Sequence, residues 1–141
     1  MYTSARNQFT GTVAKIAKGA VNAEVALKLA GDLEVVASIT LSSLERLGLK
    51  EGQSAIALIK APQVILVSAD TKLKFSARNH LTGKVSSIEK GAVNTVVSIT
   101  LAGGNTLKSV ITEDALSDLG LKDGGAVCAI FKSSSVILAV E

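Results

Sequence analysis

The sequence predicts an all-β fold of two tandem barrels, each an OB-like Greek-key barrel of five strands with one short helix between strands 3 and 4. The first observation behind this prediction is an internal repeat that spans the chain. The second is composition: 48% of residues are hydrophobic but only 3% are aromatic, so Val, Ile, Leu and Ala must form the core. The third is the order of elements in each repeat, which is that of an OB-like barrel. A β-sandwich is the alternative that this order allows.

The repeat aligns Ser4 with Ser76 and keeps that register, without a gap, to the C-terminus. Four strings recur: SARN at 4–7 and 76–79, KGAVN at 18–22 and 90–94, LGLK at 47–50 and 119–122, and VIL at 64–66 and 136–138. We therefore predict two domains, residues 1–70 and 71–141. The junction at 68–72 is polar and short, so we expect the two halves to pack against each other.

The first half of each repeat predicts three strands. In the first copy, apolar residues alternate from Phe9 to Ile16, as in a long half-buried strand. KGAVN then predicts a turn, because Gly19 and Asn22 tolerate unusual backbone angles. A second strand is predicted over 23–29 and, after the turn at 30–32, a third over 34–40.

The second half of each repeat predicts a short helix and two strands. Thr40 or Ser42 is placed to cap a helix over 43–47, and Gly48 is placed to end it. Strands are predicted over 54–59 and 64–67. Pro62 separates them, because proline lacks the N–H that a central strand needs.

Composition and charge exclude several classes of protein. Lys and Arg exceed Asp and Glu by three charges, which is too small a surplus for a nucleic-acid footprint and still permits an anionic ligand. The segment from Met1 to Asn7 has no secretory pattern, and no apolar run approaches the ~20 residues that span a bilayer. The single cysteine fits a reducing compartment. We expect a cytoplasmic protein that binds neither membranes nor nucleic acid.

The groups that enzymes activate are scarce. His80 is the only histidine and aligns with Gln8, so the repeat holds no shared histidine chemistry. Cys128 lies in an apolar run and is predicted to be a buried structural residue. The metal-ligand spacings of Cys and His and the glycine-rich nucleotide loops are both absent from the sequence. We predict that the chain is not an enzyme and has no metal cation ligands.

The repeat preserves short corners that are rich in hydrogen-bond donors. These are SARN, KGAVN, Ile-Thr at the end of the third strand, and Lys60 or Lys132 before the last strand. A dehydrated tetrahedral dianion requires many donors and no carboxylate neighbour. Asp and Glu are absent from SARN, from KGAVN, and from the residues that follow Lys60 (Ala61-Pro62) and Lys132 (Ser133-Ser134). A lining of donors also disfavours monohydrogen phosphate, whose proton needs an acceptor. The pattern favours molybdate, tungstate or sulfate.

Several motifs in the same order resemble the Mop domain of molbindins, the TOBE-like module also found in molybdate-responsive regulators. They are TSARNQ at 3–8, GAVN at 19–22, LGLKxG at 47–52 and IKAP at 59–62. The resemblance covers both halves and implies an OB-like fold. It further implies binding of molybdate or tungstate without a covalent cofactor, in intracellular molybdenum storage or homeostasis, by a homo-oligomer that is a trimer with anions at its interfaces.

The resemblance implies two classes of anion-binding residues. The first, at interfaces between modules or subunits, comprises Ser4, Ala5, Arg6, Asn7, Thr40, Ser43, Lys60, Ala61, Pro62, Ser76, Ala77, Arg78, Asn79, Thr112, Lys132, Ser133 and Ser134. The second, near the symmetry axis, comprises Gly19, Ala20, Val21, Asn22, Gly91, Ala92, Val93 and Asn94.

The two copies differ within the first class. Ser43 aligns with Ala115, and Ala61-Pro62 aligns with Ser133-Ser134, so hydroxyl groups are redistributed between the copies. We expect two related sites of unequal affinity. For the arginines, the sequence leaves open a contact with the anion or a contact that braces the neighbouring module.

Two other functions remain as alternatives. An OB-like module can bind single-stranded nucleic acid, but such surfaces use aromatic platforms, and this chain has only Tyr2, Phe9, Phe75 and Phe131. A molybdate-sensing domain that acts through a protein partner is the other alternative.

Overall fold

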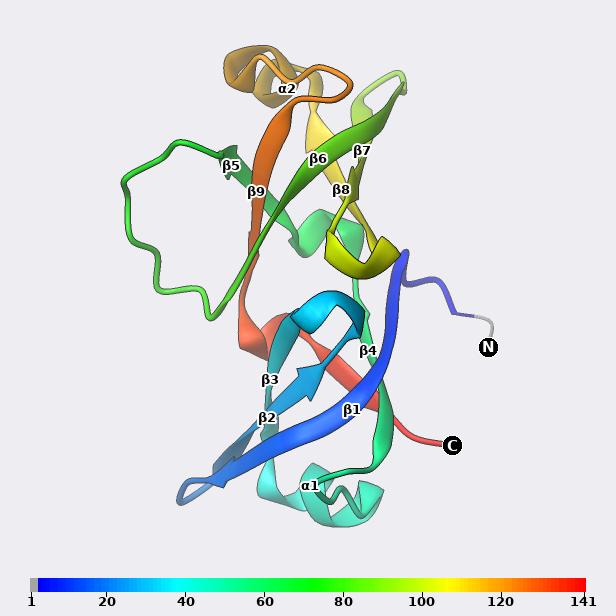
Figure 1. Ribbon diagram of the computed structural model, residues 1–141, viewed down its shortest axis with the longest axis vertical. Coiled ribbons are helices and arrows are strands. Elements are labelled where there is room, and N and C mark those ends of the chain that lie inside the picture. The colour runs from blue at the N-terminus through cyan, green and yellow to red at the C-terminus, as the bar shows by residue number, and fades with distance from the viewer. Residues whose placement is uncertain (1–2) are drawn as a thin grey trace.

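The computed structural model of the chain describes residues 3–141 and is built from two five-stranded antiparallel units stacked along the long axis (Figure 1). The first unit draws its strands chiefly from the N-terminal repeat and the second from the C-terminal repeat. The prediction of an all-β fold with two five-stranded units and one short helix in each repeat is confirmed. The first two residues of the predicted domain 1–70 lie outside the described residues.

Each repeat contains five strands in the predicted places. Those of the first repeat are β1 (Asn7–Lys18), β2 (Asn22–Lys28), β3 (Glu34–Thr40), β4 (Ser54–Ile59) and β5 (Ile65–Ser68). Those of the second are β6 (Asn79–Lys90), β7 (Asn94–Thr100), β8 (Thr106–Thr112), β9 (Ala126–Phe131) and β10 (Ile137–Ala139). Between them lie α1 (Leu41–Leu47), α2 (Glu113–Leu119) and the 3-10 turns η1 (Ala30–Asp32), η2 (Ala61–Gln63), η3 (Ala102–Gly104) and η4 (Ser133–Ser135).

The long first strand departs from a simple alternation. Phe9 and Val13 are buried, but the next inward apolar residue is Ile16, three positions on. A β-bulge between Val13 and Lys15 explains this spacing, because one extra residue shifts the side-chain alternation. The following KGAVN turn is closed by the N–H of Gly19, which donates to the carbonyl of Asn22 at 2.7 Å. Neither residue has a positive φ, so the conformational reason given for them from the sequence is wrong.

Thr40 caps α1, as one of the two sequence alternatives predicted. Its hydroxyl oxygen accepts a hydrogen bond from the backbone N–H of Ser43 at 3.1 Å. The helix begins two residues earlier than predicted, directly after this cap. Gly48 ends it in the left-handed conformation with φ 63°, as predicted. Thr112 and Gly120 do the same for α2.

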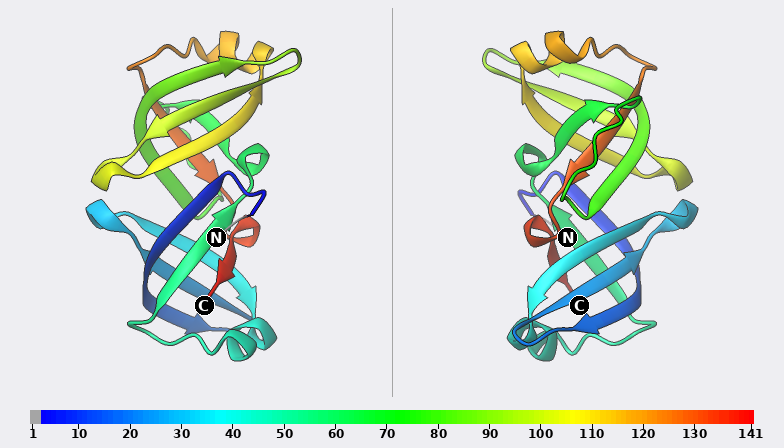
Figure 2. Two further views of the ribbon diagram at one scale, coloured as in Figure 1. Left: turned by 90° about the vertical axis from the view of Figure 1, so that its right-hand side faces the viewer. Right: turned by 90° about the vertical axis from the view of Figure 1, so that its left-hand side faces the viewer.

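The last strand of each repeat completes the sheet of the other repeat. The strand orders are β10-β4-β1-β2-β3 and β5-β9-β6-β7-β8. Ile137 of β10 pairs with Leu58 of β4, and Ile65 of β5 pairs with Ile130 of β9. Figure 2 shows the C-terminal red strand lying within the blue and cyan unit. Each sheet therefore contains strands from both predicted ranges, 1–70 and 71–141, and the folding of either range as a separate domain remains a proposal.

Two buried asparagines join the units at equivalent places. Asn7 is 1% exposed, and its side chain donates to the carbonyl of Lys108 at 2.8 Å and accepts from the N–H of Lys108 at 2.7 Å. Asn79, also 1% exposed, makes the same two bonds with Val36, at 2.8 and 2.7 Å. Each amide thus acts like one more peptide group beside a strand of the other unit.

The turns η1 and η3 also meet between the units, where the cyan and yellow turns approach each other in Figure 2. Gly31 and Gly103 have positive φ values of 78° and 70°. A Cβ atom on Gly31 would lie 2.5 Å from the backbone nitrogen of Gly103, so no larger residue fits this contact. Asn105 reinforces it by donating to the carbonyl of Ala30 at 2.9 Å.

Within residues 3–141, no helix is both long and apolar enough to cross a membrane.

Candidate oxyanion-binding site

A surface pocket of about 560 Å³ lies where the segment before β1, the end of β4 and the start of β10 meet. Its lining residues are Thr3, Ser4, Ala5, Leu58, Lys60, Gln63, Ser134, Ser135 and Ile137. Four of them, Ser4, Ala5, Lys60 and Ser134, belong to the residues predicted from the sequence.

Strand pairing explains why these residues meet. β1 pairs with β4 from Asn7 opposite Ile59, so the segment before β1 lies beside Lys60, which directly follows β4. β10 pairs with the other edge of β4, and η4 immediately precedes β10. The strand exchange therefore places Ser134 beside Ser4 and Lys60, although in the sequence it belongs with Ser76 and Lys132.

The polar lining of this pocket consists of a lysine, four hydroxyl side chains and one amide. The hydroxyls are those of Thr3, Ser4, Ser134 and Ser135, and the lining contains no Asp or Glu. Ammonium and hydroxyl groups are donors to an anion, and a carboxylate would repel it. Leu58 and Ile137 form an apolar wall. This arrangement suits a compact anion better than a cation.

Local hydrogen bonds shape the segment that carries Ser4. The hydroxyl oxygen of Thr3 accepts from the N–H of Ala5 at 3.1 Å and from the side-chain amide of Gln8 at 2.9 Å. Elsewhere in the lining, the hydroxyl of Ser135 donates to the side-chain oxygen of Gln63 at 3.4 Å. These contacts order two parts of the lining.

Three predicted residues adjacent to the pocket do not line it. Arg6 is exposed, Pro62 is exposed within η2, and Ala61 is buried at 1% exposure. Asn7 lies next along the chain, but both polar atoms of its side chain are used in the bonds to Lys108.

Thr40 and Ser43 lie at α1, away from the pocket. Their hydroxyls are 3.0 Å apart, and neither residue lines the pocket. Thr112 occupies the same place at α2, where its hydroxyl oxygen accepts from the N–H of Ala115 at 3.1 Å. The two helices lie at opposite ends of the long axis in Figure 1. Within one chain, the structure does not bring these residues to Ser4 and Lys60.

The second-repeat residues Ser76, Ala77, Lys132 and Ser133 do not line this pocket either. Ser76 and Lys132 are exposed, and Ala77 and Ser133 are half-buried. Near them, the ring of Phe75 packs against that of His80 with a centroid distance of 5.8 Å.

Arg78 makes an ion pair across the two units with Glu24 on β2. It lines a small pocket of about 160 Å³ together with Glu24 and Glu34. The SARN string itself contains no carboxylate, but the fold brings Glu24 and Glu34 close to Arg78. Of the two roles left open for the arginines, the bracing of the neighbouring unit is the one seen here. The residue that aligns with Glu24 in the second repeat is Val96.

The second predicted class of residues lies on two hairpin turns. Gly19, Ala20, Val21 and Asn22 join β1 to β2, and Gly91, Ala92, Val93 and Asn94 join β6 to β7; all are exposed. Val21 and Val93 are among the most exposed apolar residues described, at 71% and 75%. Figure 1 places the two turns at opposite ends of the molecule's long axis, so the fold of one chain does not bring them together.

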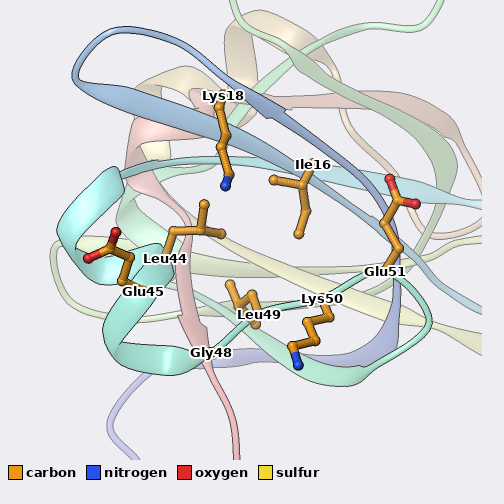
Figure 3. Close-up of a pocket in the computed structure, with 8 residues that line it drawn as sticks. All are labelled: Ile16, Lys18, Leu44, Glu45, Gly48, Leu49, Lys50 and Glu51. Carbon is orange, nitrogen blue, oxygen red and sulfur yellow. The ribbon is translucent and has the colours of Figure 1, made fainter.

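A second pocket, of about 580 Å³, lies between β1 and α1 (Figure 3). Ile16, Leu44 and Leu49 face one another in it, and its rim carries Glu45 and Glu51 as well as two lysines. None of the residues predicted to bind an anion lines this pocket. Its two carboxylates make it a poorer place for a dianion than the pocket at Lys60.

The remaining reactive side chain is Cys128, which is 3% exposed, as predicted. Burial raises the pKa of its thiol above the usual value, and a hydrogen bond with Thr82 lowers that pKa in part. Desolvation therefore keeps the thiol protonated near neutral pH. Among residues 3–141, no group of three or more His, Cys, Asp or Glu side chains is placed to hold a metal ion.

Sequence reasoning missed five residues that line the pocket: Thr3, Leu58, Gln63, Ser135 and Ile137. The run Ser133-Ser134-Ser135 was a signal for Ser135, since it puts three hydroxyls after Lys132. No local signal connects that run with Ser4, because the contact depends on which sheet β10 joins.

The TOBE domain matches the chain twice, over residues 3–66 and 76–138. The chain belongs to the TOBE domain family. This confirms the TOBE-like, molbindin-type resemblance drawn from the motifs. Each TOBE match ends within the strand that the chain exchanges, β5 in the first repeat and β10 in the second.

A solved structure of the cytoplasmic molybdate-binding protein ModG, with molybdate bound, is similar to the whole chain. It has a TM-score of 0.96 and 45% sequence identity, and each chain is covered fully by the other. Two curated relatives match nearly the whole of this chain. The transcriptional regulator ModE of Yersinia pestis is 42% identical over 99% of this chain and 53% of its own length. The molybdenum-pterin-binding protein MopA of Rhodobacter capsulatus is 41% identical over 99% of this chain and 53% of its own length.

This TOBE chain spans about half the length of the curated relatives that match it over its whole length. It matches the ModG structure from end to end.

Proposed function

We propose that the protein binds molybdate, and also tungstate, as an intact oxyanion for intracellular molybdenum storage or homeostasis. It acts in the cytoplasm without catalysing a reaction and without a covalent cofactor. The observation that carries this proposal is the pocket at Lys60, whose polar lining is made of a lysine, hydroxyls and an amide with no carboxylate. ModG, which is similar over its full length, was solved with molybdate bound.

The proposal includes a homo-oligomer, a trimer, with anions held between subunits. A buried dianion needs many donors to replace its lost water. The pocket at Lys60 lies on the surface of one chain, and Thr40 and Ser43 lie elsewhere on that chain. In this arrangement, Thr40 and Ser43 of a second subunit supply the remaining donors, and the turns at Val21 and Val93 pack near the symmetry axis. The proposed ligand is a small oxyanion, with no nucleic-acid or membrane partner.

Calorimetric titration with molybdate, tungstate, sulfate and phosphate tests the proposal. We expect molybdate and tungstate to bind at micromolar protein and ligand, and phosphate to bind weakly or not at all. Lys60→Ala removes the pocket's one cation and should weaken molybdate binding by roughly tenfold or more, since hydrogen bonds to charged groups are the stronger ones. Lys50→Ala, in the pocket of Figure 3, is the matched control and should bind like the parent chain.

A wild-type chain that gives no binding heat with molybdate under these conditions would refute the proposal. Equal losses in Lys60→Ala and Lys50→Ala would show that the effect comes from overall charge and that the pocket is not the site.

A further inference from the structure

The strand exchange gathers hydroxyl groups from both repeats at one place. Thr3 and Ser4 come from the start of the first repeat, and Ser134 and Ser135 come from η4 of the second. All four line the pocket that contains Lys60. The sequence alignment alone would have divided these hydroxyls between two sites.

The structure has an equivalent surface on the other unit, related by the internal repeat. Ile65 pairs with Ile130 there, just as Ile137 pairs with Leu58 at the pocket. The asparagine bonds between the units follow the same equivalence. The internal alignment can therefore be used to name the residue on this second surface that corresponds to each lining residue of the pocket.

The second surface has two fewer hydroxyl groups than the pocket at Lys60. Lys132 and Ser76 correspond to Lys60 and Ser4, so the cation and one hydroxyl are kept. Two hydroxyl positions, those of Thr3 and Ser134, are taken by Phe75 and Pro62. Gln63 and Ser135 align with each other, so both surfaces keep one glutamine and one serine at that pair. The ring of Phe75 packs against His80 at 5.8 Å, and proline has neither an N–H nor a side-chain donor.

The turns that contain Pro62 and Ser134 have nearly the same backbone geometry at their start and the same closing hydrogen bond. Lys60 and Lys132, which precede η2 and η4, have φ/ψ values of −71°/133° and −75°/142°. The turns are closed by the N–H groups of Gln63 and Ser135, which donate to the carbonyls of these lysines at 2.9 Å. The residue just before the closing N–H is proline in one turn (Pro62) and serine in the other (Ser134), so this position changes the donors offered to a ligand without changing the turn.

We propose that Ser134 is an affinity-determining residue of the anion site at Lys60, supplied by the other repeat through the strand exchange. The two sites of one chain are therefore unequal, and the Ser4–Lys60 site binds a tetrahedral oxyanion more tightly than the Ser76–Lys132 site does. This inference rests on the proposed function, because it assigns the ligand of that same pocket.

The test is calorimetric titration of the full chain with sodium molybdate, with reciprocal substitutions. The wild-type chain should show a tighter and a weaker class of site. Ser134→Ala should weaken the tighter class by roughly tenfold, the usual effect of losing a hydrogen bond to a charged group, and leave the weaker class unchanged. Ser134→Thr keeps the hydroxyl and should retain tight binding.

Substitution of Pro62 on the second surface tests for tighter molybdate binding, a change that a folding defect cannot produce. Pro62→Ser adds the missing hydroxyl and should tighten the weaker class. Pro62→Ala removes the ring without adding a hydroxyl and is the matched control, expected to leave the weaker class as it is.

The outcomes separate this inference from the proposed function. Molybdate binding in a single class, or in classes that Ser134→Ala and Pro62→Ser leave unchanged, would overturn the role of Ser134 and leave molybdate binding in place. A wild-type chain that binds no molybdate would overturn both.

Discussion

Asn7 and Asn79 have roles that their residue type does not reveal. Both were predicted as anion-binding residues because they lie in the repeated SARN string. The structure buries both, and each side-chain amide bonds to the backbone of one residue in the other unit. Any residue can offer a backbone N–H and carbonyl, so Lys108 and Val36 carry no sequence signal of this contact.

Asn79→Asp should destabilise the folded chain. An aspartate cannot donate to the carbonyl of Val36 and places a carboxylate beside it in a buried position. Leaving a buried polar group unsatisfied and burying an unpaired charge should lower the free energy of unfolding by about 3 kcal/mol. Urea denaturation at fixed protein concentration measures this loss.

The exposed Asn22 is the control for that substitution. Asn22→Asp should change the free energy of unfolding by less than about 0.5 kcal/mol, as is usual for surface positions. If Asn79→Asp and Asn22→Asp had the same small effect, the asparagine bonds would not hold the units together.

Much of each element could be predicted from the sequence because the causes are local. Thr40 and Gly48 delimit α1 through a side-chain cap and a left-handed glycine, both of which act within a few residues. The burial of Cys128 follows from its apolar neighbours. The bulge after Val13 was not predicted, because only the pairing of β1 with both β2 and β4 makes the extra residue visible.

The exchange of β5 and β10 could not be predicted, for a physical reason. Both strands carry the same apolar string, VIL at 64–66 and at 136–138. Either strand therefore offers the same side chains to β4 or to β9. The choice between the two arrangements depends on the path of the connecting segment, which hydrophobic periodicity does not describe.

The exchange predicts the behaviour of an isolated first repeat. A fragment of residues 1–70 keeps β5 but lacks β9, with which β5 pairs, and its β4 lacks β10. Two such fragments can satisfy both edges by exchanging β5, as in domain swapping. We expect light scattering to show species with an even number of chains.

Leu66→Asp is the control for the fragment, because Leu66 is the buried apolar residue of β5. This change should disfavour the exchange and shift the fragment towards single chains. A cooperatively folded 1–70 fragment that is monomeric without this substitution would show that the first repeat can complete its own sheet.

At the scale of the whole molecule, the proposed anion sites link ligand binding to stability. A ligand that binds only the folded and assembled form stabilises it by mass action, by about 2.7 kcal/mol at a ligand concentration 100 times the Kd. Because the pocket at Lys60 includes residues of both repeats, an anion bound there as proposed would also tie the end of the second repeat to the first.

Thermal unfolding should therefore depend on molybdate. We expect the Tm to rise by several degrees at saturating molybdate, and this rise to be smaller in Lys60→Ala. Sodium sulfate at the same ionic strength controls for the general stabilisation that excluded salts produce. A Tm that rises equally with sulfate and molybdate in both chains would show a salt effect without a specific site.

The path of the chain through its two sheets also sets the order in which they can be finished during synthesis. Domains commonly fold as units from the N-terminus while the ribosome is still translating. Here the N-terminal sheet needs β10, so its edge at β4 stays open until residue 139 has been made, whereas β5 is available before β9 exists. Neither sheet can be completed before the second repeat has been translated. Until then, the nascent chain carries β4 with one unpaired, apolar edge.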